Sequence, residues 1–194
     1  MGGRMTRSLL PLLLSLLVSG CSSLGWFSDD GGPQPAELEE LNNAFQPREL
    51  WSASVGAGAD DQRLALAPAY LDGRIFAAES GGLVKAFDAE TGDLVWSVET
   101  GLEITGGPGA GDGLVLLGTS QAELVALSAE DGSEAWRARV SSEILSVPAT
   151  ADGISVVHTL DGKIVGFDAT SGQMLWLYDR QVPILTLHGS SSPV

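Results

Sequence analysis

The sequence predicts an all-β protein built from repeated four-stranded antiparallel sheets. The main observation is a period of 40 residues, which relates Trp96, Trp136 and Trp176 to one another. Glycine makes up 25 of the 194 residues, which suits tight turns between short strands. Several registers that share one period indicate a repeat architecture. The other residues with this spacing are Gly92, Gly132 and Gly172; Asp72-Gly73, Asp112-Gly113 and Asp152-Gly153; and Pro68, Pro108 and Pro148.

Residues 1–20 are predicted to be a lipoprotein signal peptide. Two arginines are their only charged residues, and an apolar run from Leu9 to Val18 follows, interrupted by Ser15. The run is shorter than the roughly 20 apolar residues that a membrane-spanning helix needs. A buried core helix, the alternative, would need a helical partner, and the later sequence does not offer one.

Leu17–Cys21 resembles the lipobox of bacterial lipoproteins. The resemblance implies cleavage before Cys21 and its acylation, and two or three chains would bind a membrane at about 0.8 kcal/mol per buried methylene group. Because Ser22 rather than aspartate follows the cysteine, the resemblance implies a lipid anchor in the outer membrane, on its periplasmic face. An incidental free thiol is the alternative, since the chain has no second cysteine for a disulfide.

The charge of the mature chain excludes some partners. Loss of residues 1–20 removes two positive charges and changes the formal net charge from −15 to −17. Such an acidic surface repels nucleic-acid phosphates and anionic lipid head groups. We therefore expect no nucleic-acid partner, and attachment to the membrane through the lipid alone.

Residues 21–48 are expected to be the acylated cysteine and a flexible tether. Segment 29–35 contains two aspartates, two glycines and two prolines and has almost nothing to bury. Residues 36–43 could form one or two amphipathic helical turns, but this segment is too short to be stable alone. The repeats are expected to occupy residues 49–194.

Each repeat is expected to form four strands joined by three turns. Asp152-Gly153 between apolar runs is a strong hairpin signal. In the third turn, Asp168 can cap backbone N–H groups, and Gly172 can adopt the positive φ that a tight loop needs. In the third copy, the expected strands are an inner strand that begins at Pro148 and the segments 154–158, 163–167 and 174–176.

A sheet of this size cannot bury both of its faces, so successive sheets must pack on one another. Radial packing of four-stranded sheets produces a β-propeller. We expect Trp96, Trp136 and Trp176 to be the blade-packing residues. A ligand-binding aromatic cage is the alternative, but three indoles at one register favour packing between blades.

The segment Ala86–Trp96 resembles the A-x-D-x-x-T-G-x-x-x-W signature of propellers with PQQ-like repeats. In the second copy, Ser128 and Asp131 replace the aspartate and threonine of the signature. In the third copy, Gly166 and Ser171 replace its alanine and threonine. The glycine and tryptophan are kept in all three copies, so the architecture does not depend on these changes. Tryptophan-aspartate repeats match less well because their Gly-His and Trp-Asp pairs are missing.

The lipobox and segments 43–47, 51–56 and 183–189 together resemble the BamB family of outer-membrane protein assembly factors. In that family an eight-bladed propeller is closed by the strand that corresponds to Trp51. The likeness covers essentially the whole chain but only the N-terminal portion of the family, about three and a half repeats. We therefore expect a fragment that is oligomeric or aggregation-prone when purified alone. An intact ring from this chain would need pairing between copies.

The resemblance implies a non-enzymatic scaffold of the outer-membrane β-barrel assembly (BAM) complex. Its partners would be the periplasmic domains of BamA and other BAM subunits, and it would assist folding and insertion of outer-membrane proteins. Edge strands of the propeller could also accept extended segments of unfolded outer-membrane protein clients. A lipid-anchored propeller that serves another envelope complex is an alternative that the sequence leaves open.

A loop near the end of the chain is the candidate binding site. The repeat pattern breaks there, because the next proline comes 45 residues after Pro148. Leu185 and Leu187 could lie on one side of an extended segment, where they would contact a partner or fill the core between blades. In the BamB family this loop contributes to BamA binding, which implies Leu185, Leu187 and His188 as partner-binding residues. The family commonly has arginine where His188 stands, so the charge there would depend on pH.

The residues offer little for catalysis, and we expect neither an enzyme, a metal site nor a cofactor. His158 is expected in a strand, as a packed or hydrogen-bonded imidazole rather than a base. Three or four zinc ligands at suitable spacing are not visible. A PQQ-dependent dehydrogenase is the rival hypothesis because similar repeats build those enzymes. They are longer, hold calcium with acidic and amide side chains and commonly have paired cysteines, whereas Cys21 is the only cysteine here.

Overall fold

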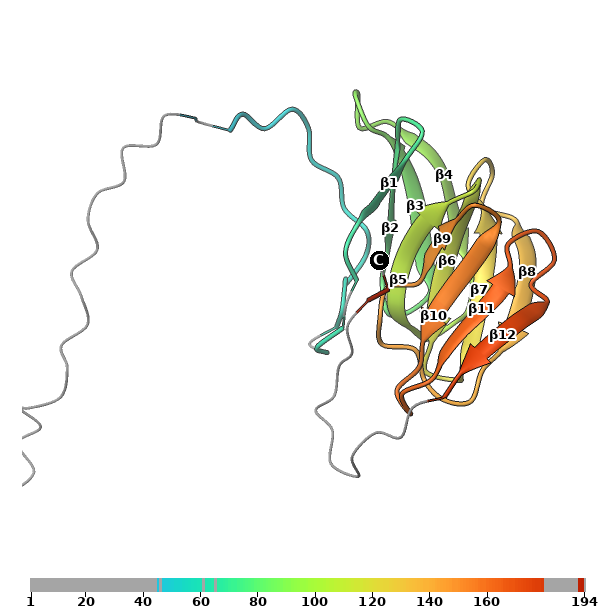
Figure 1. Ribbon diagram of the computed structural model, residues 1–194. Coiled ribbons are helices and arrows are strands. Elements are labelled where there is room, and N and C mark those ends of the chain that lie inside the picture. The colour runs from blue at the N-terminus through green and yellow to red at the C-terminus, as the bar shows by residue number, and fades with distance from the viewer. Residues whose placement is uncertain (1–44, 46, 61, 65, 180–191, 194) are drawn as a thin grey trace, which may run out of the picture. The chain divides into compact units, whose positions relative to one another are not determined.

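The computed structural model describes residues 45, 47–60, 62–64, 66–179 and 192–193. The residues from Pro47 onward form one compact unit. The described residues contain twelve strands and no helix, which confirms the all-β prediction (Figure 1). This part of the chain therefore has no helix with the length and apolar character needed to cross a membrane.

The strands form three four-stranded antiparallel sheets, each made of consecutive strands. The first sheet contains β1 (Ala69–Leu71), β2 (Arg74–Ala78), β3 (Leu83–Asp88) and β4 (Leu94–Glu99). The second contains β5 (Ile104–Gly111), β6 (Leu114–Thr119), β7 (Glu123–Ser128) and β8 (Glu134–Arg139). The third contains β9 (Ala149–Ala151), β10 (Ile154–His158), β11 (Ile164–Asp168) and β12 (Met174–Tyr178).

The Asp-Gly pairs form the first turn of each sheet, as predicted. Asp72 and Gly73 have φ values of 48° and 77°, and the two later pairs are similar. Two successive left-handed residues match the right-handed twist of the flanking strands, which is why Asp-Gly is preferred in two-residue hairpins. In the first repeat this turn aligns Leu71 with Arg74 across the hairpin.

The third turn of each sheet is held by a side-chain cap, also as predicted. The carboxylate of Asp88 accepts hydrogen bonds from the backbone N–H groups of Thr91 (2.8 Å) and Glu90 (3.0 Å). These bonds, together with one from the Thr91 hydroxyl, lower the pKa of Asp88. In the second sheet the Ser128 hydroxyl instead accepts a hydrogen bond from the backbone N–H of Glu130. The substitution in the signature therefore changes the capping atom and keeps the turn.

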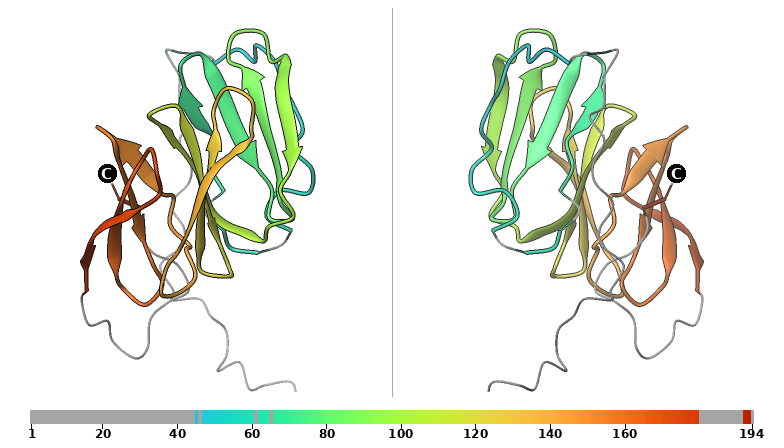
Figure 2. Two further views of the ribbon diagram at one scale, coloured as in Figure 1. Left: turned by 90° about the vertical axis from the view of Figure 1, so that its right-hand side faces the viewer. Right: turned by 90° about the vertical axis from the view of Figure 1, so that its left-hand side faces the viewer.

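The three sheets pack face to face in chain order, as adjacent blades of a β-propeller do (Figure 2). The middle sheet is buried on both faces because its side chains alternate in direction. On β6, Val115 and Leu117 pack against the first sheet, while Leu116 packs against the third. Two hydrophobic cores result, one at each junction between blades.

The inner strand of the third sheet, expected to begin at Pro148, is β9, which begins at Ala149. The inner strand of the second sheet is longer, because β5 begins at Ile104 and includes Pro108, with two register irregularities. A proline is tolerated at a bulge of an edge strand, where its missing N–H removes no regular pairing. Gly106 and Gly109 lie directly against backbone carbonyls of Ser146 and Pro148, so a side chain on either glycine would collide with them.

Candidate functional site

Each junction between blades is joined by a tryptophan that hydrogen-bonds the next sheet. The indole N–H of Trp96 on β4 donates to the carbonyl of Ala129 (3.1 Å). The indole of Trp136 on β8 donates in the same way to Ala169 (2.7 Å). Trp136 is 8% exposed, so its polar atom needs this buried partner. Each indole thus connects its own outer strand to the third turn of the following blade.

A glycine lies beneath each of these rings. Gly132 has a φ of +76°, and a Cβ built on it would lie 2.8 Å from a ring carbon of Trp96. Gly172 has a φ of +69°, and a Cβ built on it would lie 2.6 Å from a ring carbon of Trp136. The repeated glycine therefore meets two needs, the left-handed backbone of the turn and the close approach of the neighbouring indole.

Trp51 makes the same contact on the outer face of the first sheet, although it does not lie in a strand. Its indole donates to the carbonyl of Ala89 (3.1 Å), and its ring lies against Gly92. Its ring centroid is 6.2 Å from that of Phe87. The acceptor alanines were not singled out from the sequence, although the spacing of 40 residues between Ala89, Ala129 and Ala169 is a signal that could have found them.

Trp176, the third expected packing residue, is placed differently. It is 42% exposed, and its ring lies against Gly166 on its own sheet. Gly166 is its cross-strand partner, whereas Trp96 and Trp136 face Ala86 and Ala126 at the same position. The missing Cβ leaves room for the indole on its own sheet. Among the residues that the structure covers, no further sheet packs over this face.

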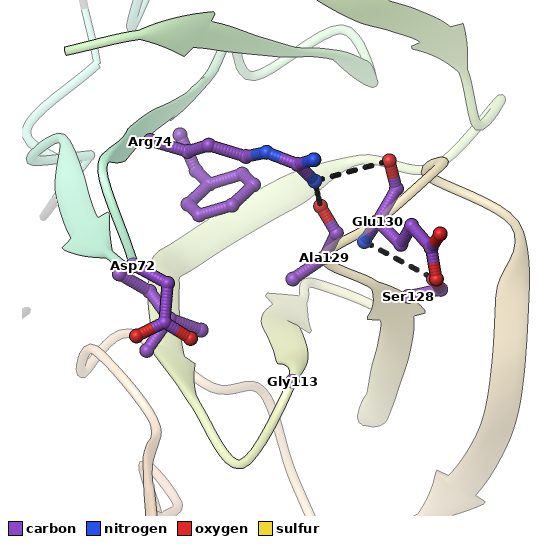
Figure 3. Close-up of a pocket in the computed structure, with 8 residues that line it drawn as sticks. Asp72, Arg74, Gly113, Ser128, Ala129 and Glu130 are labelled. Carbon is purple, nitrogen blue, oxygen red and sulfur yellow. Dashed lines mark hydrogen bonds between the residues drawn. The ribbon is translucent and has the colours of Figure 1, made fainter.

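A cavity of about 390 Å³ lies at the junction between the first two blades (Figure 3). Arg74 reaches across it and donates from Nη1 to the carbonyls of Ala129 (2.8 Å) and Glu130 (3.1 Å). The Ala129 carbonyl therefore accepts from both Arg74 and Trp96. The cavity lining also includes Asp72 and Phe76.

The second and third blades are linked by a cluster around Asp161, in the turn between β10 and β11. Its Oδ1 accepts hydrogen bonds from the hydroxyls of Ser141 (3.0 Å) and Ser142 (3.0 Å), two residues that precede the third blade. The same oxygen accepts a hydrogen bond from the hydroxyl of Thr159 (2.6 Å). Its Oδ2 pairs with Lys163 at 2.7 Å. Partial burial would raise the pKa of Asp161, but these donors outweigh it and hold the pKa well below its usual range. The carboxylate thus fastens the connection between the two blades.

The strands β4, β8 and β12 are each the outermost strand of their sheet (Figure 1). On β8, Glu134 and Arg137 form an ion pair at 2.8 Å, and Arg137 also contacts Glu123 at 3.0 Å. On β4 the corresponding position to Glu134 is Leu94, which is 55% exposed. The edge of β8 is therefore charged, whereas β4 has a single charged residue, Glu99, and β12 has none.

The other predicted site residues lie outside the described residues. These are the lipidation residue Cys21 and the loop residues Leu185, Leu187 and His188. The residue nearest to that loop with a described contact is Ser192, whose hydroxyl accepts a hydrogen bond from the N–H of Val147 (3.1 Å). The loop's binding role stays a prediction.

The described part of the chain contains no group of three histidine, cysteine or acidic side chains that could hold a metal ion. His158 lies half-buried in β10, and its backbone carbonyl accepts a hydrogen bond from the Ser146 hydroxyl (2.9 Å). A second cavity, of about 410 Å³, has an acidic lining that includes Asp60, Glu79, Glu103 and Glu143. Two of these carboxylates already accept hydrogen bonds, from Ala57 and Ser120.

Known structures share this architecture. BamB from Moraxella catarrhalis superposes with a TM-score of 0.59 and 29% identity, covering 66% of this chain and 38% of that one. A europium-containing methanol dehydrogenase superposes with a TM-score of 0.58 at 19% identity, covering 70% of this chain and 27% of the enzyme. At that identity the likeness to the dehydrogenase shows the shared fold alone.

Sequence comparison is more specific. BamB of Alkalilimnicola ehrlichii is 44% identical over 105 residues, and BamB of Escherichia coli K12 is 40% identical over 96 residues. These alignments cover 54% and 49% of this chain but only 25% and 24% of the relatives, so the match extends over about a quarter of their length. The family model described as outer membrane protein assembly factor BamB matches residues 43–106 and 80–194. The chain, with its β-propeller blades, therefore belongs to the BamB family.

Proposed function

We propose that this chain acts as a non-enzymatic scaffold lipoprotein of the machinery that assembles outer-membrane proteins. The observation that carries the proposal is the family match over residues 43–194, together with relatives that are named as outer-membrane protein assembly factors. The blades suit a scaffold because their large side chains are used to hold sheets together. Binding would use surface loops and strand edges.

The proposed partners are the periplasmic domains of BamA and other subunits of the assembly complex. Affinity purification of the tagged chain from detergent-solubilised envelopes tests this proposal. Recovery of BamA is the expected result, and a different stable complex without BamA would overturn it. That outcome would instead support the alternative of a propeller serving another envelope complex.

The proposed contact residues are Leu185, Leu187 and His188. Leu187→Asp should abolish capture of BamA and leave the β signal in circular dichroism unchanged, because a charge in an apolar contact is not compensated there. Tyr70→Asp is the matched control, since Tyr70 is an exposed apolar residue on β1 at a distance in sequence from the loop. Equal capture by both variants and by the unchanged chain would refute the assignment of the loop.

We further propose that Cys21 carries the lipid that holds the chain at the periplasmic face of the outer membrane. Cys21→Ser should move the chain from the outer-membrane fraction to the soluble periplasmic fraction, since no other strong anchor is expected on an acidic surface. A variant that stays with the outer membrane in high salt would contradict the lipid anchor.

The rival activity can be tested directly. The fold is shared with a dehydrogenase at 19% identity, which makes quinone-dependent oxidation the reaction to exclude. Incubation with pyrroloquinoline quinone, calcium and alcohols, with dye reduction as the readout, should give no turnover above the protein-free rate. Turnover that depends on the quinone would replace the scaffold proposal.

A further inference from the structure

The cavities at the two junctions between blades occupy equivalent positions, so their linings can be compared residue by residue. The cavity between the second and third blades has a volume of about 460 Å³. The lining positions that the two cavities share are Asp72 and Asp112, Arg74 and Leu114, Gly113 and Gly153, Ala129 and Ala169, and Glu130 and Thr170. The repeat therefore builds a cavity at each junction, and the chemistry of its lining differs between the two.

The first cavity contains an arginine where the second contains a leucine. Figure 3 shows Arg74 reaching across the cavity to the second blade. Both of its hydrogen bonds, to the carbonyls of Ala129 and Glu130, start from Nη1. Its Nε and Nη2 donate to no acceptor among the residues that the structure covers. Because a guanidinium has five N–H donors in a planar fork that matches a carboxylate, Arg74 retains the capacity to bind one.

The aspartate of the first cavity also retains its binding capacity. In the second cavity, the carboxylate of Asp112 accepts hydrogen bonds from the Thr150 hydroxyl (3.2 Å) and the Gly153 N–H (3.0 Å). Ala110 stands in the first repeat where Thr150 stands in the second, so Asp72 has no hydroxyl donor there. Within the described ranges, the carboxylate of Asp72 takes part in no hydrogen bond or ion pair. It can therefore accept hydrogen bonds from a ligand ammonium group.

The rest of the lining and the charge of the chain restrict the ligand further. Leu71, which is half-buried, and Phe76, which is fully buried, give the cavity an apolar wall. A volume of about 390 Å³ lies within the range of small-molecule pockets. A purely anionic ligand would be repelled by a chain with a net charge of −15, whereas a ligand with one charge of each sign would not.

We propose that the cavity between the first two blades binds a zwitterionic α-amino acid with an apolar side chain. The carboxylate of the ligand binds the guanidinium of Arg74, its ammonium group binds the carboxylate of Asp72, and its side chain lies against the apolar wall. This binding goes beyond the scaffold function and does not depend on it, because the cavity uses none of the loop residues that are proposed to contact BamA.

The experiment measures binding of free leucine to the full chain in detergent by isothermal titration calorimetry. Three analogues each lack one of the three features: N-acetylleucine lacks the ammonium group, leucinamide lacks the carboxylate, and glycine lacks the apolar side chain. Leucine should bind saturably, and each analogue should bind at least about tenfold more weakly. Because Asp72 is exposed, the affinity for leucine should also fall as the salt concentration rises.

Two variants locate the binding site. Arg74→Leu introduces the residue that the next repeat has at Leu114, and the Ala129 carbonyl keeps its hydrogen bond from Trp96. The fold should therefore tolerate this change, and the affinity for leucine should fall at least about tenfold. Circular dichroism checks that the sheets are retained.

Asp72→Asn is the second variant, and it keeps a residue type that accepts the φ of 48° in this turn. It should bind leucine at least about tenfold more weakly and lose the preference for leucine over N-acetylleucine. Asp152→Asn is the matched control, because Asp152 has a φ of 54° in the equivalent turn of the third blade and lines neither junction cavity. Its affinity for leucine should equal that of the unchanged chain.

The absence of saturable leucine binding would overturn the proposal, as would unchanged affinity in the Arg74→Leu variant. Equal affinities for leucine and N-acetylleucine in the unchanged chain would also overturn it, because they would indicate a site for a simple carboxylate. These results are separable from the test of the proposed function. If leucine binds as expected but BamA is not recovered, the amino-acid site stands and the scaffold proposal falls. If BamA is recovered but leucine does not bind, only the amino-acid site falls.

Discussion

The indole N–H of Trp136 in the second blade donates a 2.7 Å hydrogen bond to the backbone carbonyl of Ala169 in the third. Trp136→Phe removes this donor and part of a buried ring, so the free energy of unfolding should fall by about 1–3 kcal/mol. Urea denaturation followed by circular dichroism checks this value. Trp176→Phe is the control and should cost less than about 0.5 kcal/mol, because Trp176 is 42% exposed. Equal losses in the two variants would show that the hydrogen-bonded junction adds nothing.

Gly132→Ala should separate the cost of backbone strain from that of a collision. Gly113 has a similar φ, +74° against +76°, but a Cβ on Gly113 would meet no atom within 4 Å, whereas one on Gly132 would meet Trp96. Gly113→Ala should therefore cost about 1–2 kcal/mol for the left-handed backbone alone. Gly132→Ala should cost about 1–3 kcal/mol more because the indole must shift. Equal unfolding free energies for the two variants would contradict the role of Gly132 in packing.

Arg74 and Trp96 should be coupled, because both donate to the carbonyl of Ala129. In Arg74→Leu or Trp96→Phe alone, the other donor still satisfies this buried acceptor. The double variant leaves it without either donor, so its loss of stability should exceed the sum of the single losses by about 1 kcal/mol. A double-mutant cycle from urea denaturation measures this coupling. Additive losses would mean that the two donors act independently.

Asp161 should make the chain sensitive to acid. Its pKa is lowered in the folded state, so folding favours the ionised form, and the stability it contributes is present above the unfolded pKa of about 3.9. This contribution is lost as the pH falls from that value toward the lower folded pKa. Asp161→Asn should lower stability at neutral pH and reduce the steepness of the loss below about pH 4. Thermal unfolding across this range tests the sign, with Asp60→Asn as an exposed control.

The features that the sequence predicted correctly are those that depend on neighbouring residues. Asp72-Gly73 forms its hairpin because two successive residues can adopt left-handed φ values, and Asp88 caps a turn whose N–H donors lie two and three residues ahead. The period of 40 residues then places equivalent strands in successive sheets. Local chemistry and repetition were therefore sufficient for the architecture of the blades.

The features that were missed depend on single residues outside the repeat pattern. Arg74 corresponds to Leu114 and Ile154 in the other copies, so periodicity does not mark it as a link between blades. Trp176 lies against Gly166, where the other two copies have alanine, and its expected contact with a following blade stays a prediction because the described residues contain no such blade. The close approach of Gly106 and Gly109 on β5 to the backbone of Ser146 and Pro148 is a long-range contact that the period does not show. None of these effects is encoded by spacing along the chain.

The acceptor at every junction is a main-chain oxygen, which each amino acid carries. A blade can therefore exchange most of its side chains without changing the docking point that it offers to the preceding indole, as long as the nearby glycine is kept. Blades from distant relatives should be interchangeable at these boundaries, and chimeric rings assembled by cutting between a tryptophan and the following turn should fold.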